Sequence, residues 1–394
     1  MYKLASTTWG KEELKIASDL LKSRNLTMGN YVKEFETRFA DFIGSKYAVM
    51  FNSGSSANLA MITALKYVRN SQIKDGDNII VPAVSWSTTY YPITQNNLII
   101  NFVDIDIETL NIDVTKIKNS INEQTRAIFA VNLLGNPSNL IKLRELANEY
   151  KLILIEDNCE SLGASINGKL AGSFGDASTH SFFFSHHICT IEGGMVNTNS
   201  KELMETLISL RAHGWTRGLE KNNSVYNSSE NDWDNLYRFV LPGYNLRPTE
   251  LNGAIGIEQL KKFPTFLSNR RKNADYFLSK FDGSDNYRIQ VQNGNSSWFG
   301  FSIILRNRLT GMRKEIIDML SKNGIETRPV VAGNFTRNPV MKHLRYLPLP
   351  ELPAANLVHD QGFFIGNHHY DVSNEILRVY SLIREFELKI VKGQ

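Results

Sequence analysis

Short runs of β-branched and aromatic residues alternate with helical patterns from about residue 47 onward. The strand-like runs are YAVMFN (47–52), DNIIVPAVSW (77–86), LIINFVDI (98–105), AIFAVNLLG (127–135) and LILIED (152–157). Runs with few charges, separated by helices such as SANLAMITALKYV (56–68), are typical of a parallel sheet covered on both faces. We therefore predict an α/β fold with a mostly parallel central sheet. Ligands of such sheets bind beyond the carboxyl ends of the strands.

The length of the chain indicates a second domain, because 394 residues exceed what one hydrophobic core usually supports. A polar, Asn- and Ser-rich stretch (219–235) is typical of an exposed loop, and a helix is expected over about 249–262. Further strand and helix patterns follow at 296–305, 311–323 and 373–385. We place the domain boundary near residue 255. Residues 1–255 then form a large domain with an N-terminal arm, and residues 256–394 form a smaller C-terminal α+β domain.

Composition narrows the class of function. The formal net charge is +4, with both signs interspersed, so nucleic acid is not expected as a partner. The two cysteines, Cys159 and Cys189, are too few for a disulfide framework or for the four thiolates of an iron–sulfur cluster. The N-terminus has no apolar signal-like region and no run approaches 18 apolar residues, so we expect a cytoplasmic protein without a membrane partner.

A phosphate site is suggested by NSGSSAN (52–58), which lies between a strand and a helix. Gly54 allows close approach of the backbone, and Ser55 and Ser56 offer hydroxyl groups. The helix N-terminus adds free N–H groups and a positive dipole end. The alternative is that Ser55 is only a helix N-cap. The motif alone leaves both interpretations open.

Two further residues are expected at strand ends. Asp157 closes KLILIEDN, and a carboxylate there faces the ligand crevice and needs a cationic partner, for which a protonated pyridine nitrogen would serve. Glu160 lies one turn further on and could reach the same ligand. Trp86, in AVSWSTTYY, could stack on a flat heteroaromatic ring. The alternatives are that Asp157 is an N-cap and that Trp86 is a core residue.

A phosphate cradle, a ring stacker and a partner for a pyridine nitrogen together describe a site for pyridoxal 5'-phosphate (PLP). The chain resembles the sugar aminotransferases of the DegT/DnrJ/EryC1/StrS family, of the fold-type-I, aspartate aminotransferase-like group. The resemblance covers nearly the whole chain. It includes TMGNYVKEFETRFADFIGSKYAV, VDIDIETLNID, LIEDNCESLGA, IEGGMV and GYNLRPTELNGAIG, in that order.

One departure from the family pattern stands in SFFFSHHICTIEGG (181–194). The resemblance implies a lysine six residues before the Glu-Gly-Gly, where it forms a Schiff base with PLP. His186 occupies that position, and no lysine lies between Lys169 and Lys201. An imidazole cannot form a stable Schiff base with the cofactor aldehyde, but it can move protons near neutral pH. We therefore predict that His186 is a free catalytic base.

A metal site is the alternative for this histidine-rich segment. His180, His187 and Cys189 surround His186 in the sequence. Adjacent residues of an extended strand point to opposite faces, so His186 and His187 cannot easily share one metal ion. No carboxylate lies among them. We therefore predict no metal and a structural role for His187.

The exchange of lysine for histidine resembles a small branch of the family, the sugar 3-dehydratases, and so do SHHI and RAHGWTR. That resemblance implies removal of the C3 hydroxyl from a GDP-linked 4-keto-6-deoxyhexose, in dideoxysugar biosynthesis for the O-antigen. L-Glutamate would convert PLP to pyridoxamine 5'-phosphate (PMP). A related branch uses an iron–sulfur cluster with a CDP-linked sugar, and the two cysteines argue against it.

The resemblance also implies roles for three more residues. Asn245, in GYNLRP, matches a residue that reaches the cofactor phosphate from the neighbouring subunit, which implies a homodimer with shared active sites. His213 matches a histidine near the reacting sugar, although a core or hydrogen-bonding role is equally compatible with its sequence. Ser181 matches a phosphate ligand. Ser185 stands where the aminotransferases commonly carry asparagine.

Two rival functions stay open at this point. One is an ordinary nucleotide-sugar 4-aminotransferase with an unusual base. The other is a family member that lost catalysis with its lysine and acts as a binding module. Asp157, Ser55 and Trp86 argue against the second, because each lacks an obvious purpose without the cofactor ring.

Overall fold

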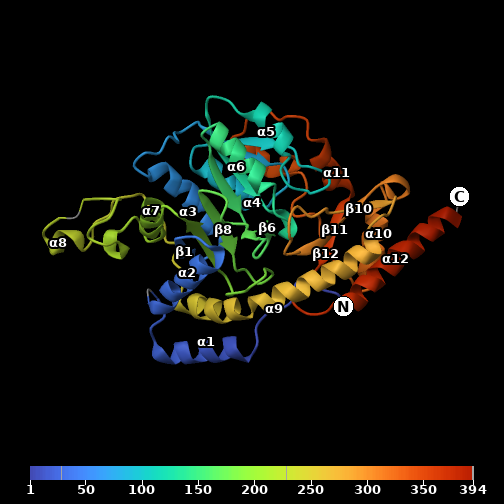
Figure 1. Ribbon diagram of the computed structural model, residues 1–394, viewed down its shortest axis with the longest axis horizontal. Coiled ribbons are helices and arrows are strands. Elements are labelled where there is room, and N and C mark those ends of the chain that lie inside the picture. Colours follow the sequence, from blue (N-terminus) through green and yellow to red (C-terminus); the bar gives the residue numbers. More distant parts are fainter. Residues whose placement is uncertain (28, 228, 393–394) are drawn as a thin grey trace.

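The computed structural model describes residues 1–27, 29–227 and 229–392. At its centre is a seven-stranded sheet in the order β1-β9-β8-β5-β4-β2-β3 (Figure 1). The strands are β1 (Tyr47–Phe51), β2 (Asn78–Pro82), β3 (Ile99–Val103), β4 (Thr125–Val131), β5 (Ile153–Asp157), β8 (Ala177–Ser181) and β9 (Gly194–Thr198). Strand β9 is antiparallel to both of its neighbours, and the other pairs are parallel. The prediction of an α/β fold with a mostly parallel sheet is confirmed.

Alternation of apolar side chains places helices on both faces of the sheet. In β2, Ile79 and Val81 enter one buried cluster, and Ile80 enters another on the opposite face. The first cluster includes residues of α3 (Gly54–Tyr67), α4 (Ser87–Gln95) and α7 (Lys201–Arg211). The second includes residues of α5 (Val114–Ser120) and α6 (Leu140–Glu149). Helix α2 (Asn30–Ile43) packs on α9 (Glu250–Phe281) around a third buried cluster.

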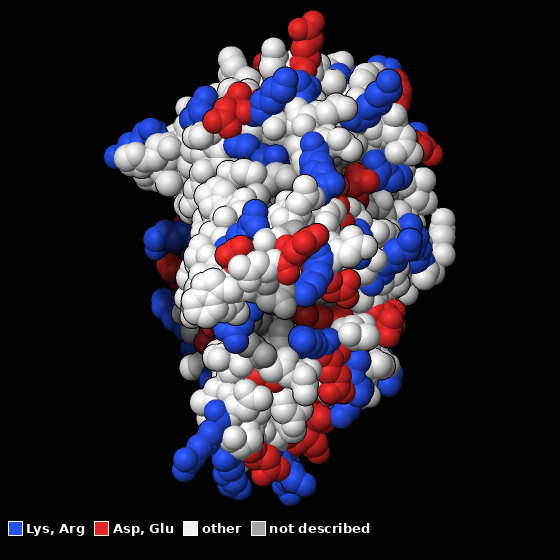
Figure 2. Space-filling view, turned by 90° about the vertical axis from the view of Figure 1, so that its left-hand side faces the viewer, with Lys and Arg blue, Asp and Glu red and all other residues white. Residues whose placement is uncertain are grey.

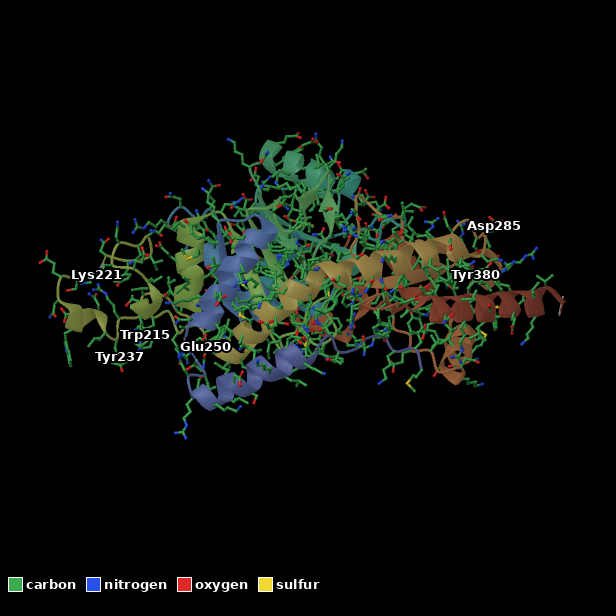
Figure 3. All side chains as sticks on the ribbon, turned by 60° about the horizontal axis from the view of Figure 1, so that its bottom comes forward. Trp215, Lys221, Tyr237, Glu250, Asp285 and Tyr380 are labelled. Carbon is green, nitrogen blue, oxygen red and sulfur yellow. The ribbon has the colours of Figure 1, made fainter. Side chains whose placement is uncertain are left out.

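Helix α9 (Glu250–Phe281) has 32 residues and connects the region around the central sheet with a second core (Figure 3). Glu250, at its start, accepts hydrogen bonds from the N–H groups of Tyr31 and Val32, and so holds the first turn of α2. The helix predicted over 249–262 extends to Phe281 in the structure. The predicted boundary at residue 255 falls within this helix and stays a prediction.

The second core surrounds a three-stranded antiparallel sheet of β10 (Tyr287–Ile289), β11 (Gly300–Leu305) and β12 (Gly362–Gly366). Helices α10 (Arg313–Lys322) and α12 (Ser373–Lys392) pack with the end of α9 around it. Tyr2, near the N-terminus, is buried in the same cluster. In the described part of the chain, the remaining elements are α1 (Lys11–Ser23), α8 (Asp232–Asn235), α11 (Pro353–Gln361), β6 (Ser165–Ile166), β7 (Lys169–Leu170) and five short 3₁₀ helices.

A projection extends from one end of the molecule and carries helix α8 and the described residues of the polar stretch, 219–227 and 229–235 (Figure 1). At its base the ring of Trp215 stacks on that of Tyr237, with centroids 5.4 Å apart and planes 10° from parallel (Figure 3). The face of the molecule at this end carries Lys and Arg interspersed with Asp and Glu (Figure 2). No helix among the described residues is both long and apolar enough to cross a membrane.

Candidate active site

Asp157 lies at the carboxyl end of β5 and is 6% exposed. Its Oδ1 accepts a hydrogen bond from the N–H of Cys159, and its Oδ2 accepts from Asn58 Nδ2 and Thr89 Oγ1, each at 3.1 Å. In the part of the chain that the structure describes, no Lys or Arg forms an ion pair with this carboxylate. An unpaired carboxylate with so little exposure is suited to a cationic ligand group.

The N-terminus of α3 lies against β8 at the same edge of the sheet. The N-cap is Ser53, whose Oγ accepts from the N–H of Ser56 at 3.0 Å, so the alternative that Ser55 caps this helix is wrong. Ser55 is exposed in the first turn. A Cβ atom on Gly54 would lie 2.5 Å from Cβ and 2.9 Å from Oγ of Ser181. Gly54 therefore lets the first turn of α3 approach Ser181 closely, so that free helix N–H groups and the Ser181 hydroxyl lie side by side, an arrangement that suits binding of a phosphate group.

Trp86 precedes α4 and is 59% exposed, so the alternative that it is a core residue is wrong. Its carbonyl accepts from the N–H of Thr89, and Thr89 is the residue that donates to Asp157. The first turn of α4 thus brings the exposed indole to the region of the buried carboxylate. An indole face in that position can stack on a flat ring.

His186 lies in the connection between the antiparallel strands β8 and β9. Its Nδ1 lies 3.3 Å from the carbonyl oxygen of Ser181. A carbonyl can only accept, so Nδ1 carries the proton and Nε2 is left with a free lone pair. The edge of the ring packs on Phe299, with centroids 5.5 Å apart. Burial lowers the pKa of His186 to about 4, against opposing effects of the Ser181 carbonyl and the Asp157 charge. The imidazole is therefore neutral at pH 7.

The neighbouring histidines have different environments. His187 is buried, and its Nε2 lies 3.2 Å from the carbonyl oxygen of Ser297. His180 is buried beside Phe39, and burial lowers its pKa to about 3. Among the described residues, no group of three or more His, Cys, Asp and Glu side chains could hold a metal ion.

Glu160 accepts a hydrogen bond at Oε2 from the N–H of Leu134 at 2.9 Å. Burial raises the pKa of its carboxyl to about 7, and the Asp157 charge adds to this effect. At neutral pH the group is thus close to half-protonated, and it can either donate to or accept from a ligand.

His213 and Asn245 lie together on the exposed surface rather than in direct contact with the residues above. Ala212 and Asn245 form an isolated β-bridge, and the N–H of His213 donates to the carbonyl of Tyr244. Both side chains are exposed, and Oδ1 of Asn245 accepts from Nε of Arg247 at 3.1 Å. Their surface adjoins a cavity of about 830 Å³ that includes Ala212 and Arg247 in its wall. Ser185 is half-buried beside His186.

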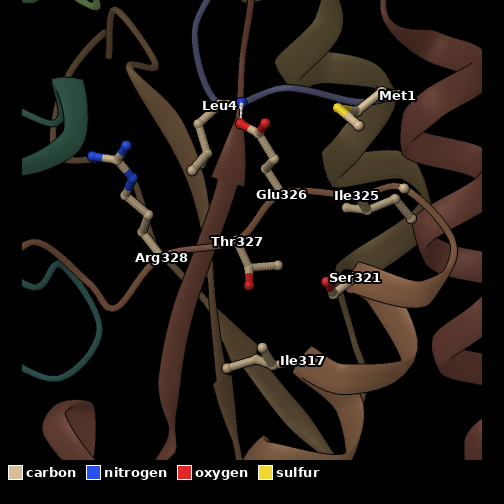
Figure 4. Close-up of a pocket in the computed structure, with 9 residues that line it drawn as sticks. Met1, Leu4, Ile317, Ser321, Ile325, Glu326, Thr327 and Arg328 are labelled. Carbon is tan, nitrogen blue, oxygen red and sulfur yellow. Dashed lines mark hydrogen bonds between the residues drawn. The ribbon is translucent and has the colours of Figure 1, made fainter.

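A second cavity, of about 480 Å³, lies in the smaller core between the N-terminal residues and the segment after α10 (Figure 4). Its wall includes Met1, Ile317, Ser321 and Arg328. None of the residues at the carboxyl end of β5 lines it. It therefore provides no part of the site around Asp157 and His186.

Sequence reasoning missed three buried residues of the site, Asn58, Thr89 and Thr179, which are all 0% exposed. One signal was present for Asn58, which follows Gly54 by four residues and so lies on the same face of the helix. Thr89 and Thr179 carried no distinguishing signal.

These residues fit PLP. The start of α3, which Gly54 lets approach the Ser181 hydroxyl, suits its phosphate, the unpaired carboxylate of Asp157 suits its ring nitrogen, and the exposed indole of Trp86 suits its ring. His186 has no primary amine, so it offers no group for a covalent link to the aldehyde.

A family model described as the DegT/DnrJ/EryC1/StrS aminotransferase family matches residues 7–384. GDP-4-keto-6-deoxy-D-mannose 3-dehydratase of Escherichia coli O55:H7 is 50% identical over 377 residues, which are 95% of this chain and 97% of that protein.

Solved structures agree with the sequence comparison. That of E. coli GDP-4-keto-6-deoxy-D-mannose-3-dehydratase with bound hydrated PLP has a TM-score of 0.94 and 49% identity, over 97% of this chain and 99% of the other. A structure of GDP-4-keto-6-deoxymannose-3-dehydratase with a trapped PLP-glutamate geminal diamine has a TM-score of 0.95 and 49% identity. It covers 97% of this chain and 100% of the other.

Proposed function

Since the chain belongs to the DegT/DnrJ/EryC1/StrS aminotransferase family, we propose that it is a PLP- and glutamate-dependent 3-dehydratase acting on GDP-4-keto-6-deoxy-D-mannose. The product is GDP-4-keto-3,6-dideoxy-D-mannose, a precursor of dideoxysugars such as colitose in the O-antigen. The observation that carries the proposal is His186, a neutral imidazole with a free Nε2 at the position of the family's lysine.

The cofactor is held by contacts without a covalent link to protein. Gly54, Ser55 and the N-terminus of α3 bind its phosphate together with the Ser181 hydroxyl. Asp157 accepts from the ring nitrogen, and the Trp86 indole covers one face of the ring. Glu160, with a pKa near 7, offers a further hydrogen-bonding group at the same edge of the sheet. When bound, PLP supplies an electron sink and, as PMP, the amine that engages the sugar's 4-keto group.

His186 moves the protons of the reaction through Nε2. As a base it takes the α-proton of glutamate in the first half-reaction. In the second half-reaction it would take a proton from C4′ of the cofactor. The imidazolium that results is a stronger acid than free imidazolium, because partial burial lowers its pKa. It therefore protonates the departing C3 hydroxyl readily. Glutamate is oxidised to 2-oxoglutarate and releases its nitrogen as ammonia, while the sugar loses its C3 oxygen.

The absence of a primary amine at residue 186 favours dehydration over transamination. A lysine could displace an amino product by forming a covalent link with the cofactor, and a histidine cannot. Instead, protonated His186 can donate its proton to the departing C3 hydroxyl group.

A homodimer is part of the proposal. The projection exposes a cluster of large apolar side chains, with exposed fractions of 77% for Trp233, 77% for Tyr237 and 56% for Phe239. Apolar surface of this kind supports burial against a second copy of the chain. In that dimer Asn245 donates to the phosphate bound by the partner, and His213 approaches the sugar. We place the enzyme in the cytoplasm with its nucleotide-sugar and glutamate substrates, without an iron–sulfur cluster.

The proposal is tested by product analysis with GDP-4-keto-6-deoxymannose, PLP and glutamate. Ammonia and 2-oxoglutarate should accumulate with the dideoxysugar, and neither should form when glutamate is omitted. A stable amino sugar would instead identify an aminotransferase. No change in cofactor absorbance on mixing with PLP would identify a binding module.

A further inference from the structure

The hydrogen bonds to Asp157 are distributed unequally between its two oxygens. Oδ2 accepts two, from Asn58 Nδ2 and Thr89 Oγ1, and Oδ1 accepts one, from the N–H of Cys159. Each carboxylate oxygen has two lone pairs, so Oδ2 is saturated and Oδ1 keeps one open. One lone pair of Oδ1 is therefore available to a further donor.

The orientation of the Asn58 amide is fixed by its hydrogen-bond partners. Thr179 Oγ1 donates to Asn58 Oδ1 at 2.6 Å, and Asn58 Nδ2 donates to the carbonyl of Thr88 as well as to Asp157, each at 3.1 Å. A rotation of the amide by 180° would place its oxygen against a carbonyl and a carboxylate. It would also turn its NH₂ group toward Thr179. The Thr88 carbonyl and the Asp157 carboxylate, which only accept, therefore select the orientation that faces Asp157 with a donor, and the Thr179 hydroxyl satisfies the amide oxygen in that orientation.

Thr89 has one hydroxyl hydrogen, which it donates to Asp157 Oδ2. Its 2.8 Å contact with Ser85 Oγ must then be a bond that Ser85 donates. Asn58, Thr89 and Thr179 are each 0% exposed, so water does not substitute for any of them. Helices α3 and α4 thus each place one donor on the same oxygen atom at the end of β5, and strand β8 supports the donor from α3.

We propose that Asn58 is a positioning residue for the reaction. With its amide held by the Thr179 hydroxyl and the Thr88 carbonyl, it saturates Asp157 Oδ2 and directs the open lone pair of Oδ1 to the ring nitrogen of PLP. This inference rests on the proposed function. It adds a residue that touches neither substrate nor cofactor but determines how Asp157 meets the ring.

The test uses Asn58→Leu and Thr179→Val, which remove hydrogen-bonding groups with little change in volume, and Thr179→Ser as the matched variant that keeps the hydroxyl. Two readouts are measured besides turnover. One is the equilibrium affinity for PLP by absorbance titration. The other is the ¹⁵N chemical shift of bound PLP labelled at the ring nitrogen, which reports whether that nitrogen is protonated.

We expect Asn58→Leu to weaken PLP binding by about tenfold, the effect of losing one hydrogen bond to a charged group. Its ¹⁵N shift should move toward the unprotonated form. Thr179→Val should change both readouts in the same direction and Thr179→Ser should change them far less. Folded Asn58→Leu or Thr179→Val protein with wild-type affinity and ¹⁵N shift would overturn the inference, and Thr179→Val decides it if Asn58→Leu does not fold. Failure of the wild-type protein to bind PLP would refute the proposed function instead.

Discussion

Substitution of Gly54 by alanine tests the phosphate cradle. It has two opposing effects on stability: a lower entropy of the unfolded chain and a steric overlap in the folded protein. Gly54 is the first residue of α3, and its φ is not among the positive values of the chain. At such a position a change from Gly to Ala ordinarily stabilises a protein by about 0.4–1 kcal/mol, through the entropy of the unfolded chain.

Steric overlap reverses that expectation here. The new Cβ would lie 2.5 Å from Cβ of Ser181 and 3.2 Å from Sγ of Cys159. Carbon atoms in favourable contact are about 3.5–4.0 Å apart, so the overlap with Ser181 is about 1 Å or more. Overpacking of this kind costs about 1–3 kcal/mol. The steric overlap should therefore outweigh the entropic stabilisation, with a net destabilisation of about 1–2 kcal/mol.

The same overlap would push the first turn of α3 away from the Ser181 hydroxyl, and these are the groups proposed to bind the phosphate. We expect affinity for PLP to fall at least about tenfold, or about 1.4 kcal/mol. Urea denaturation without cofactor measures the first effect, and absorbance titration with PLP measures the second. The double variant Gly54→Ala with Ser181→Gly removes the closest overlap, and should regain part of the stability but not the affinity. An alanine variant with unchanged stability and wild-type affinity would refute the cradle.

Three further predictions concern other parts of the site. Asp157→Asn should abolish most turnover and reduce PLP affinity only in part, because the ring loses its anionic partner; steady-state kinetics near wild type would remove Asp157 from that role. Asn245→Ala should weaken PLP binding without unfolding the subunit, and mixing it with His186→Ala should restore activity in heterodimers; confirmed subunit exchange without recovery would exclude shared sites. His180 has a pKa of about 3 in the folded protein against 6.5 ordinarily, so its contribution to stability is complete above pH 6.5 and decreases as the pH falls toward 3. Since one pKa unit corresponds to about 1.4 kcal/mol, His180→Leu should narrow the loss of unfolding free energy between pH 7 and pH 5 by about 2 kcal/mol, and equal pH dependence in both proteins would contradict this.

The strands that sequence reasoning identified are those whose apolar runs fill the two faces of the sheet. Strand β8 was missed because ASTHS (177–181) has no apolar pattern, although all five residues are buried. Its hydroxyl groups are satisfied by specific partners. Ser178 donates to the carbonyl of Gly172, and Thr179 donates to Asn58. The partner of Thr179 lies 121 residues away in the sequence, so a local pattern cannot reveal it.

Helix α9 shows a second limit. The predicted helix ends at 262, two residues before Pro264, a residue that disfavours a helix interior. The structure continues the helix through Pro264 to Phe281, where Phe277 and Phe281 are buried in the second core. Tertiary packing at the far end outweighs the local preference.

Candidate site residues could be predicted where a residue type at the end of a buried strand has few structural roles. Asp157 and Gly54 were found in this way, and the structure places both at one edge of the sheet. The role of Gly194 was not predictable. A Cβ atom on it would lie 2.6 Å from the backbone nitrogen of Gly54, so this glycine lets β9 approach the start of α3. That contact exists only once the sheet has formed.

Borohydride trapping tests the central claim, that His186 replaces a covalent lysine and stays a free base. Wild-type protein and His186→Lys are each loaded with PLP, reduced, digested and mapped by mass spectrometry. Dehydration should fall sharply in the variant, because its amine is bound at rest and a protonated lysine is a weaker acid than imidazolium. The account predicts a cofactor label on the peptide that contains residue 186 in the variant, and no peptide-bound label in the wild type. A label on any lysine of the wild-type protein would contradict it.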